Sequence, residues 1–304
     1  MDAPHDVRLP QALSARTLTV DDVDDVVAMV NVCELHDTGE LMWERADLLA
    51  DASTQGFDRD GDWVGVFDAG EVVGWAMVVH VRSAWADVRP SHRGRGVGTW
   101  LRRWTETRAA ATDAPRIGQT LDDALEGPQR LLRDAGYTPR HTSWILQMDH
   151  PERPADPEPP AGVTLRPWRP DDTGPAMLMF ERAFSEFRDR LPSTLVTWRA
   201  MTVEREGFAP EDLVLAVEDG EIVGGAFILD SDEIWVDKLA VAREARHRGV
   251  ARALLTTAFQ RSFDRGYRQT RLSTDSKTGA LALYERVGMR VARSFTHLAI
   301  DLPT

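Results

Sequence analysis

The sequence has a single cysteine, Cys33, among its 304 residues, so no disulfide can form within the chain. Such cysteine usage is typical of a protein in a reducing cytosol. No apolar run is long enough to cross a bilayer. The first ten residues carry acids and lack the apolar segment of a signal peptide. We therefore expect a cytoplasmic protein that does not bind a membrane.

Basic residues are also scarce relative to acidic ones. There are 36 Lys and Arg against 49 Asp and Glu, which gives a net charge of −13. Because this charge repels phosphate backbones, we expect no nucleic-acid partner, whereas a cationic substrate such as an amine is compatible with it. The eight histidines show no spacing typical of metal ligands, so we predict no metal site.

The sequence contains an internal repeat. Four separated features recur at a steady shift of about 150 residues. They are Arg16/Asp22 with Arg166/Asp172, Gly70–Ala76 with Gly220–Ala226, Arg93–Gly98 with Arg246–Ala251, and Ala135–Tyr137 with Val287–Met289. The length fits two domains of about 150 residues. We predict an N-terminal domain at 1–149, a stiff proline-rich linker at 150–160 and a C-terminal domain at 161–304.

Periodicity and turn residues predict a mixed α/β fold in both copies. In the second copy, the helix capped by Asp171 or Asp172 comes first. The elements that follow it are strands at 213–217, 222–229 and 234–241, a helix at 250–263, a strand at 271–274, a short helix at 279–286 and a strand at 295–302. The first copy shows the same order, with strands at 63–67, 72–79, 85–88 and 144–148 and a helix from 97 to about 110.

Both copies place a basic, glycine-containing turn between a strand and an amphipathic helix. The turns are RGRGVG at 93–98 and RHRGVA at 246–251. Glycine allows close backbone approach, and the first amides of a helix lack internal partners, so each turn can bind an anion. Neither is a Walker loop or a GxGxxG fingerprint. A solvated glycine turn would explain one copy, but a duplicated arrangement favours a phosphate site.

These residues resemble a known family. Arg93, Gly96 and Gly98, and likewise Arg246, Gly249 and Ala251, match the coenzyme A signature of the GNAT acyltransferase superfamily. The run LYERVGM at 283–289 resembles the family's helix end, with Met in place of Phe. The tandem arrangement resembles mycothiol synthase and other actinobacterial double-GNAT proteins.

The resemblance implies two tandem GNAT folds. Each has a mixed, mostly antiparallel sheet with splayed central strands flanked by helices, and acetyl-CoA is the cofactor. In the second copy, the pantetheine would lie between the strands at 234–241 and 271–274. The implied cofactor contacts there are Leu239, Ala240, Val241, Arg246, His247, Arg248, Gly249, Val250, Ala251, Ser273 and Lys277, the last standing where many members have asparagine. In the first copy they are Val88, Arg93, Gly94, Arg95, Gly96, Val97 and Gly98.

Three residues are candidates for proton transfer. Tyr284 stands where the family's general acid stands, and the alternative is a tyrosine that only packs on the sheet. Asp237 and Glu233 lie an even number of residues before Leu239, so we expect them on its face as candidate bases. The alternative is a pair of solvated strand-end acids.

The first copy lacks these groups. Leu132 replaces Tyr284, Ala84 replaces Asp237 and His80 replaces Glu233, at the repeat's shift. We therefore predict that the first copy is catalytically degenerate and the second is catalytic.

The sequence thus predicts an N-acetyltransferase that acts on a primary amine of a small molecule by direct attack. Glu186, Arg188 and Trp198 are candidate acceptor contacts. A narrower alternative is mycothiol synthase, and an alternative of another class is a non-catalytic acyl-CoA-binding module. The chain is expected to be a monomer or a homodimer, and the acceptor's identity stays open.

Overall fold

A computed structural model describes residues 9–10, 12–54, 56–80, 82–186, 193–230 and 233–303. The chain divides into two compact units. Unit 1 comprises Met1–Thr142 and Phe295–Thr304, and unit 2 comprises Ser143–Ser294. Residues 150–160, the predicted linker, contain neither helix nor strand.

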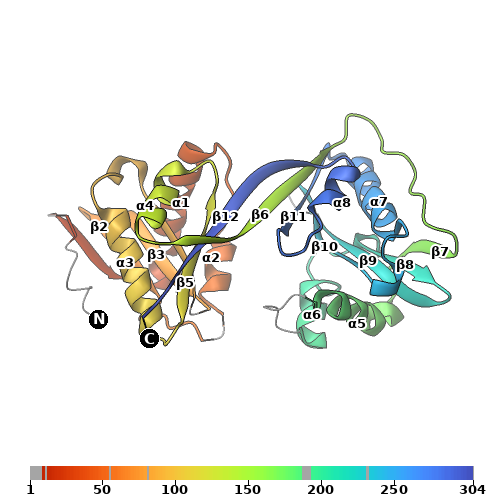
Figure 1. Cartoon of the computed structure of the whole chain (residues 1–304), viewed down its shortest axis with the longest axis horizontal. Helices are drawn as coiled ribbons and strands as arrows, with labels where there is room; N and C mark the ends of the chain where they lie inside the picture. The colour runs from red at the N-terminus through yellow and green to blue at the C-terminus, as the bar shows by residue number, and fades with distance from the viewer. Residues whose placement is uncertain are drawn as a thin grey trace. The chain divides into compact units, whose positions relative to one another are not determined.

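The two units repeat one order of elements (Figure 1). The elements of unit 1 are β1 (Leu13–Thr17), α1 (Val23–Asp37), α2 (Arg45–Asp51), β2 (Trp63–Asp68), β3 (Glu71–Val79), β4 (Ser83–Val88), α3 (Val97–Ala110), β5 (Arg116–Asp122) and α4 (Glu126–Asp134). Those of unit 2 are β7 (Val163–Pro167), α5 (Thr173–Phe184), α6 (Leu195–Met201), β8 (Leu213–Glu218), β9 (Glu221–Asp230), β10 (Ile234–Val241), α7 (Val250–Asp264), β11 (Gln269–Asp275) and α8 (Leu281–Arg286). The last strands, β6 (Thr138–Asp149) and β12 (Arg290–Asp301), each have residues in both units. Short 3-10 turns lie at Val20–Asp22, Pro90–His92, Pro170–Asp172, Pro210–Asp212 and Arg243–Ala245.

The strand order confirms the predicted fold class. It is β1-β2-β3-β4-β5-β12 in unit 1 and β6-β11-β10-β9-β8-β7 in unit 2. Within each unit the described strand pairs are antiparallel except for β4 with β5 and β10 with β11. The sheets are therefore mixed and mostly antiparallel, as expected.

The last strands of the two repeats are exchanged. β12 completes the sheet of unit 1 by pairing with β5 from Phe295↔Asp122 to Asp301↔Arg116. The C-terminal part of β6 completes the sheet of unit 2 by pairing with β11 from Gln269↔Asp149 to Asp275↔Ser143. The compact units thus differ from the predicted ranges 1–149 and 161–304, because each repeat's final strand ends in the other repeat's sheet.

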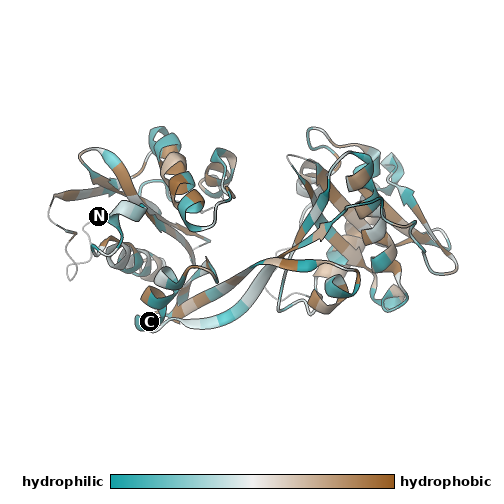
Figure 2. Ribbon diagram, turned by 90° about the horizontal axis from the view of Figure 1, so that it is seen from above, coloured by the Kyte–Doolittle hydropathy of each residue, from teal (hydrophilic) through white to brown (hydrophobic). Residues whose placement is uncertain are grey.

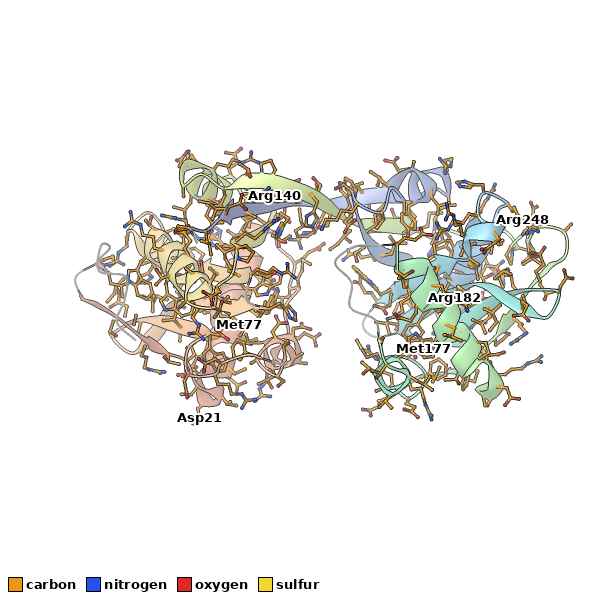
Figure 3. All side chains as sticks on the ribbon, turned by 60° about the horizontal axis from the view of Figure 1, so that its bottom comes forward. Asp21, Met77, Arg140, Met177, Arg182 and Arg248 are labelled. Atoms are coloured by element: carbon orange, nitrogen blue, oxygen red, sulfur yellow. The ribbon has the colours of Figure 1, made fainter. Side chains whose placement is uncertain are left out.

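Helices cover both faces of each sheet. In unit 2, Phe180 of α5 and Trp198 of α6 pack on one face with Phe227, while Leu254 of α7 packs on the other with Val250 (Figure 1). The strands of this sheet are largely apolar, and the helices carry both apolar and polar residues (Figure 2). Unit 1 is built in the same way, and its residue Met77 is fully buried (Figure 3).

A repeated glycine explains how the long helix packs on the sheet. A Cβ on Gly74 would lie 3.0 Å from Val97 Cγ1 of α3, and one on Gly224 would lie 3.1 Å from Val250 Cγ1 of α7. A side chain at either position would press against the helix, so glycine favours close helix-to-strand contact at both positions. The repeat of GEVVGWA and GEIVGGA thus has a local packing cause.

The repeated Arg and Asp residues form matching ion pairs. Arg16 binds Asp22 in a bidentate contact at 2.6 and 2.7 Å, and Arg166 binds Asp172 at 2.6 and 2.8 Å. Asp172 also accepts the backbone N–H of Arg169 at 2.7 Å. Its carboxylate therefore closes the 3-10 turn that precedes α5, and the hydrogen bonds from Arg166 lower its pKa.

Candidate active site

The two central strands of unit 2 part after a short pairing. β10 and β11 are paired in parallel at Ile234↔Thr270 and Trp235↔Arg271. Beyond that point β10 stays paired with β9 up to Val241, and β11 stays paired with β6. The predicted splay is therefore present, and two strands with unshared inner edges can hold an extended ligand between them.

The start of α7 presents unpaired amides. Gly249 precedes the helix with φ +99°, a left-handed conformation that favours glycine, and His247 also has a positive φ of 61°. The first bond of the helix runs from the Ala253 N–H to the Gly249 carbonyl at 3.0 Å. The preceding N–H groups of Val250, Ala251 and neighbouring residues have no partner within the helix, so they can bind an anion. The Val250 side chain is 1% exposed, so only its backbone is available to a cofactor.

The arginines of this turn are held by carboxylates. Arg246 donates to the Val241 carbonyl at 3.1 Å and to Glu186 at 2.8 Å. Arg248, labelled in Figure 3, binds Glu218 through both of its terminal nitrogens at 2.5 and 2.9 Å. The Arg248 side chain is 39% exposed and that of Glu218 is 23% exposed, and an ion pair in contact with solvent is weak enough to reorganise around a phosphate.

Tyr284 lies beside the parting strands. It is 8% exposed and belongs to an apolar cluster with Val236 of β10 and Leu272 of β11, against which Leu239 also packs. Burial raises the pKa of Tyr284 to about 12. No hydrogen bond to its hydroxyl is formed by the residues that the structure describes. The phenol is therefore a protonated donor without a partner at neutral pH.

A register shift in β10 falls at Asp237. The register between β9 and β10 shifts between Val236 and Lys238, so Asp237 is the extra residue. Because a bulge interrupts the regular alternation of faces, even spacing does not decide which face Asp237 takes, and its position beside Leu239 stays a prediction. The Asp237 side chain is 31% exposed and pairs with Lys238.

The other predicted residues of unit 2 are dispersed around the strand ends. Glu233 pairs with Arg271 at 3.4 Å. Ser273 is exposed on β11, and the Lys277 backbone N–H is bonded to Asp275 at 2.9 Å. Leu239 is half-buried, whereas Ala240 and Val241 are buried.

The three candidate acceptor contacts differ in position. Glu186 is exposed and is bonded to Arg246. Arg188 lies outside the described residues. Trp198 is 2% exposed and packs against Phe180, with ring centroids 6.4 Å apart. A buried indole has no free surface for a substrate, so the structure places Trp198 in the core.

Unit 1 has the same glycine-containing turn before its long helix. β4 and β5 are paired at Ser83↔Gly118 and then part. Gly94 and Gly96 have φ values of +73° and +90°, and α3 opens with the Trp100 N–H bonded to Gly96. The remaining cofactor candidates follow the pattern of unit 2. Arg93 donates to the Val88 carbonyl and to Asp37, and Arg95 is exposed. Val97 is 1% exposed, and a Cβ on Gly98 would contact Leu131.

Unit 1 lacks the counterpart of Tyr284. Leu132 is 2% exposed and packs in the apolar core of unit 1. Sequence reasoning did not single out Asp87, a half-buried carboxyl on β4 next to Val88 whose pKa burial raises to about 6. The signal was present, because an acid interrupts an otherwise apolar strand end in the first copy only.

Comparison with known proteins identifies the family. A model of the acetyltransferase (GNAT) family matches the chain twice, at residues 23–137 and 177–289. The chain therefore belongs to the GNAT family and is an acetyltransferase with two tandem GNAT folds.

Two curated relatives of this chain are mycothiol acetyltransferases. A mycothiol acetyltransferase of Frankia casuarinae is 30% identical over 245 residues, which cover 69% of this chain and 70% of the relative. A mycothiol acetyltransferase of Salinispora tropica is 31% identical over 229 residues, which cover 71% of each chain.

Solved structures agree on the fold. A GCN5-related N-acetyltransferase from Sphaerobacter thermophilus is 30% identical, with a TM-score of 0.82 and coverage of 98% of both chains. A tandem GNAT protein from the clavulanic acid biosynthesis pathway has a TM-score of 0.73 at 17% identity and covers 96% of this chain and 99% of that one, so it supports the fold alone.

Two further observations concern membranes and metals. No helix in the described parts of the chain is long and apolar enough to cross a bilayer. Among the same residues, no group of three or more His, Cys, Asp or Glu side chains is arranged to hold a metal ion.

Proposed function

We propose that unit 2 transfers the acetyl group of acetyl-CoA to a primary amine of a small molecule by direct attack, in the cytoplasm. The observation that carries this proposal is the position of Tyr284 in one cluster with side chains of both parting strands, β10 and β11. A thioester held between these strands would have a protonated phenol beside its sulfur.

Cofactor binding uses the start of α7 and the parting strands. The free amides from Gly249 to Ala251 suit a diphosphate, because they donate hydrogen bonds without losing any that the helix needs. The bulge leaves the backbone of Asp237 outside the regular ladder, next to the thioester's expected place. Its amide is a candidate donor to the thioester carbonyl as negative charge develops there.

The reaction breaks the C–S bond and forms a C–N bond. The attacking amine has to be neutral, and its excess proton passes to a carboxylate, directly or through water. Asp237 and Glu233 are the candidate acceptors; Asp237 is paired with Lys238, and Glu233 is paired with Arg271. Tyr284 donates its proton to the departing sulfur.

The test is an amine-library screen that measures release of the coenzyme A thiol. We expect release by the intact chain to depend on an added amine and to fall when Tyr284→Phe is introduced. An acyl-CoA-binding module without catalysis would bind acetyl-CoA but release no thiol with any amine. That result would contradict the proposal.

The curated relatives favour one specific acceptor class. Five of them are named mycothiol acetyltransferases, so mycothiol synthase is the second candidate. Including the acceptor of a mycothiol acetyltransferase in the same screen distinguishes the two. A kcat/KM for that acceptor far above all other amines supports the narrower function, and an equal or lower value contradicts it.

A further inference from the structure

Unit 1 contains a cluster of aromatic and acidic side chains that the proposed function does not use. We call Trp43, Trp75, Trp85, Glu34 and Asp87 the tryptophan–carboxylate cluster. Trp43 meets Trp75 edge-on at 6.0 Å between ring centroids and Trp85 edge-on at 4.9 Å. Trp75 donates its indole N–H to Asp87 at 2.9 Å, and Glu34 accepts the backbone N–H of Trp43 at 3.3 Å. These contacts join the five residues into one continuous group.

The cluster is only partly buried. Trp75 is 1% exposed and forms its base, whereas Trp43, Trp85, Glu34 and Asp87 are half-buried. Large aromatic rings and carboxylates that keep partial contact with solvent can bind a ligand without opening the core.

The electrostatics of the cluster favour a cation. Desolvation raises the pKa of Asp87 to about 6, the Trp75 hydrogen bond opposes this, and the charges of Glu34 and Asp37 raise the pKa further. Arg93 is the cation that lowers it, but its guanidinium is bonded to both carboxylate oxygens of Asp37. No salt bridge to Asp87 is formed within the described residues. A bound cation would stabilise the ionised carboxylate that the protein otherwise disfavours.

A second observation points the same way. The Asn31 side-chain oxygen, an acceptor, is buried and has no hydrogen-bond partner among the described residues. The buried Trp85 indole N–H also has no partner there, but it is a donor, which a cation does not satisfy. Asn31 lies one turn before Glu34 on α1, so the two side chains are neighbours on that helix. A buried acceptor without a donor costs stability, and a ligand or water that supplies a donor would remove that cost.

The second repeat shows that the fold does not require this cluster. Val88 pairs with Gly74, and Val241 pairs with Gly224, so the strands β4 and β10 are in matching register. At this register the counterpart of Asp87 is Ala240. In the same way, Gly225 stands opposite it in place of Trp75, and Lys238 stands in place of Trp85. An acid and two indoles at these positions are therefore a property of unit 1 and not of the GNAT sheet.

We propose that the tryptophan–carboxylate cluster of unit 1 is a binding site for an organic ammonium ion, separate from the reaction in unit 2. Asp87 and Glu34 supply the counter-charge, and Trp43 and Trp85 supply ring surfaces, which attract cations through their quadrupoles.

The test is isothermal titration calorimetry of the full chain with choline and with 2-phenylethylamine, with potassium chloride as the inorganic control. We expect saturable binding of at least one organic ammonium and none of potassium. Asp87→Asn keeps an oxygen to accept the Trp75 N–H but removes the charge, so it should weaken binding by about tenfold or more. Asp21→Asn is the matched control, because Asp21 is exposed in the same unit (Figure 3).

A pH series gives an independent readout. The groups around Asp87 are Glu34, Asp37, Arg93 and the neutral thiol of Cys33, whose pKa burial raises. Since Asp87 gains a proton as pH falls through about 6, binding by the intact chain should weaken below that pH, and the Asp87→Asn variant should lose this dependence. The proposal is overturned if neither ammonium binds the intact chain, if potassium binds equally, or if Asp87→Asn binds as tightly as the intact chain. Tyr284→Phe should bind the ammonium unchanged, whatever the outcome for catalysis.

Discussion

Replacing Tyr284 by phenylalanine removes one hydroxyl from the apolar cluster beside β10 and β11. The Tyr284 side chain is 8% exposed, and no described residue is bonded to its hydroxyl. The ring's packing remains in phenylalanine, so we expect the free energy of unfolding to change by less than about 1 kcal/mol. Any loss of activity is then a loss of chemistry and not of fold.

The size of the effect follows from the proton that Tyr284 has to give. Its pKa is raised to about 12 by burial, and a thiol has a pKa of about 8.5 in water. At about 1.36 kcal/mol per pKa unit, transfer to a solvated thiolate would be uphill by about 5 kcal/mol. The transfer becomes favourable only as the thiolate develops in the same apolar surroundings, which raise its pKa as well. General acid catalysis is worth about 100- to 10,000-fold, so Tyr284→Phe should lower kcat by about 100-fold or more.

The assay is steady-state thiol release with the best amine found in the library, with circular dichroism to confirm folding. Tyr267→Phe is the matched control, since it removes a tyrosine hydroxyl of unit 2 that is bonded to Asp230 at 2.7 Å. We expect the control to keep its kcat. A Tyr284→Phe enzyme with more than half of the original kcat would refute the assignment of Tyr284 as the acid.

Three further outcomes are expected. Gly249→Ala places a Cβ on a residue with φ +99°, which should lower the unfolding free energy by about 1–2 kcal/mol. The variant should also bind coenzyme A more weakly in a titration. Unchanged affinity would argue against the α7 amides as the diphosphate site. His150 is 1% exposed, and burial lowers its pKa, so the unfolded chain takes up a proton at a higher pH than the folded chain does. The contribution of His150 to the unfolding free energy is therefore full above a pH of about 6.5 and should fall below it. Denaturant titrations at several pH values should show this fall, and His150→Gln should reduce it. Asp172→Asn leaves Arg166 without its bidentate partner and should lower the unfolding free energy by about 3 kcal/mol. A variant that melts at the same temperature as the intact chain would contradict this prediction.

Much of the fold could be predicted because the repeated residues have local physical causes. Gly249 and Gly96 need left-handed φ values, and Gly224 and Gly74 permit close helix packing. Such requirements are satisfied by glycine wherever the chain repeats the geometry, so they are visible in the sequence. Patterns of this kind predicted the order of elements and the glycine-containing turns before α3 and α7.

The position of Asp237 could not be predicted in the same way. A bulge inserts one residue into β10, and apolar alternation in a strand of eight residues does not reveal where this happens. The pairing partners of the last strands were also beyond the sequence, since β6 and β12 have similar patterns and either one fits beside β5 or β11.

The acid of unit 1 was missed for a different reason. Comparing the second copy with the first reveals functional side chains that the first copy has lost, as with Leu132 in place of Tyr284. It does not reveal side chains that the first copy alone possesses. Asp87 has Ala240 as its counterpart, so it has no match to find. A search for acids in apolar strand ends would have detected it.

Each repeat depends on the other for its fold, because the final strand of each one completes the sheet of the other. A fragment that stops at residue 149 would leave the edge of β5 bare unless its own β6 folds back beside it, and a fragment that begins at residue 161 would leave β11 bare unless β12 does the same. Open edges of this kind recruit other chains, so each fragment made alone should aggregate or pair with its complement. On the ribosome, the first sheet stays incomplete until residues 295–301 have been synthesised, and both repeats therefore reach their mature state together.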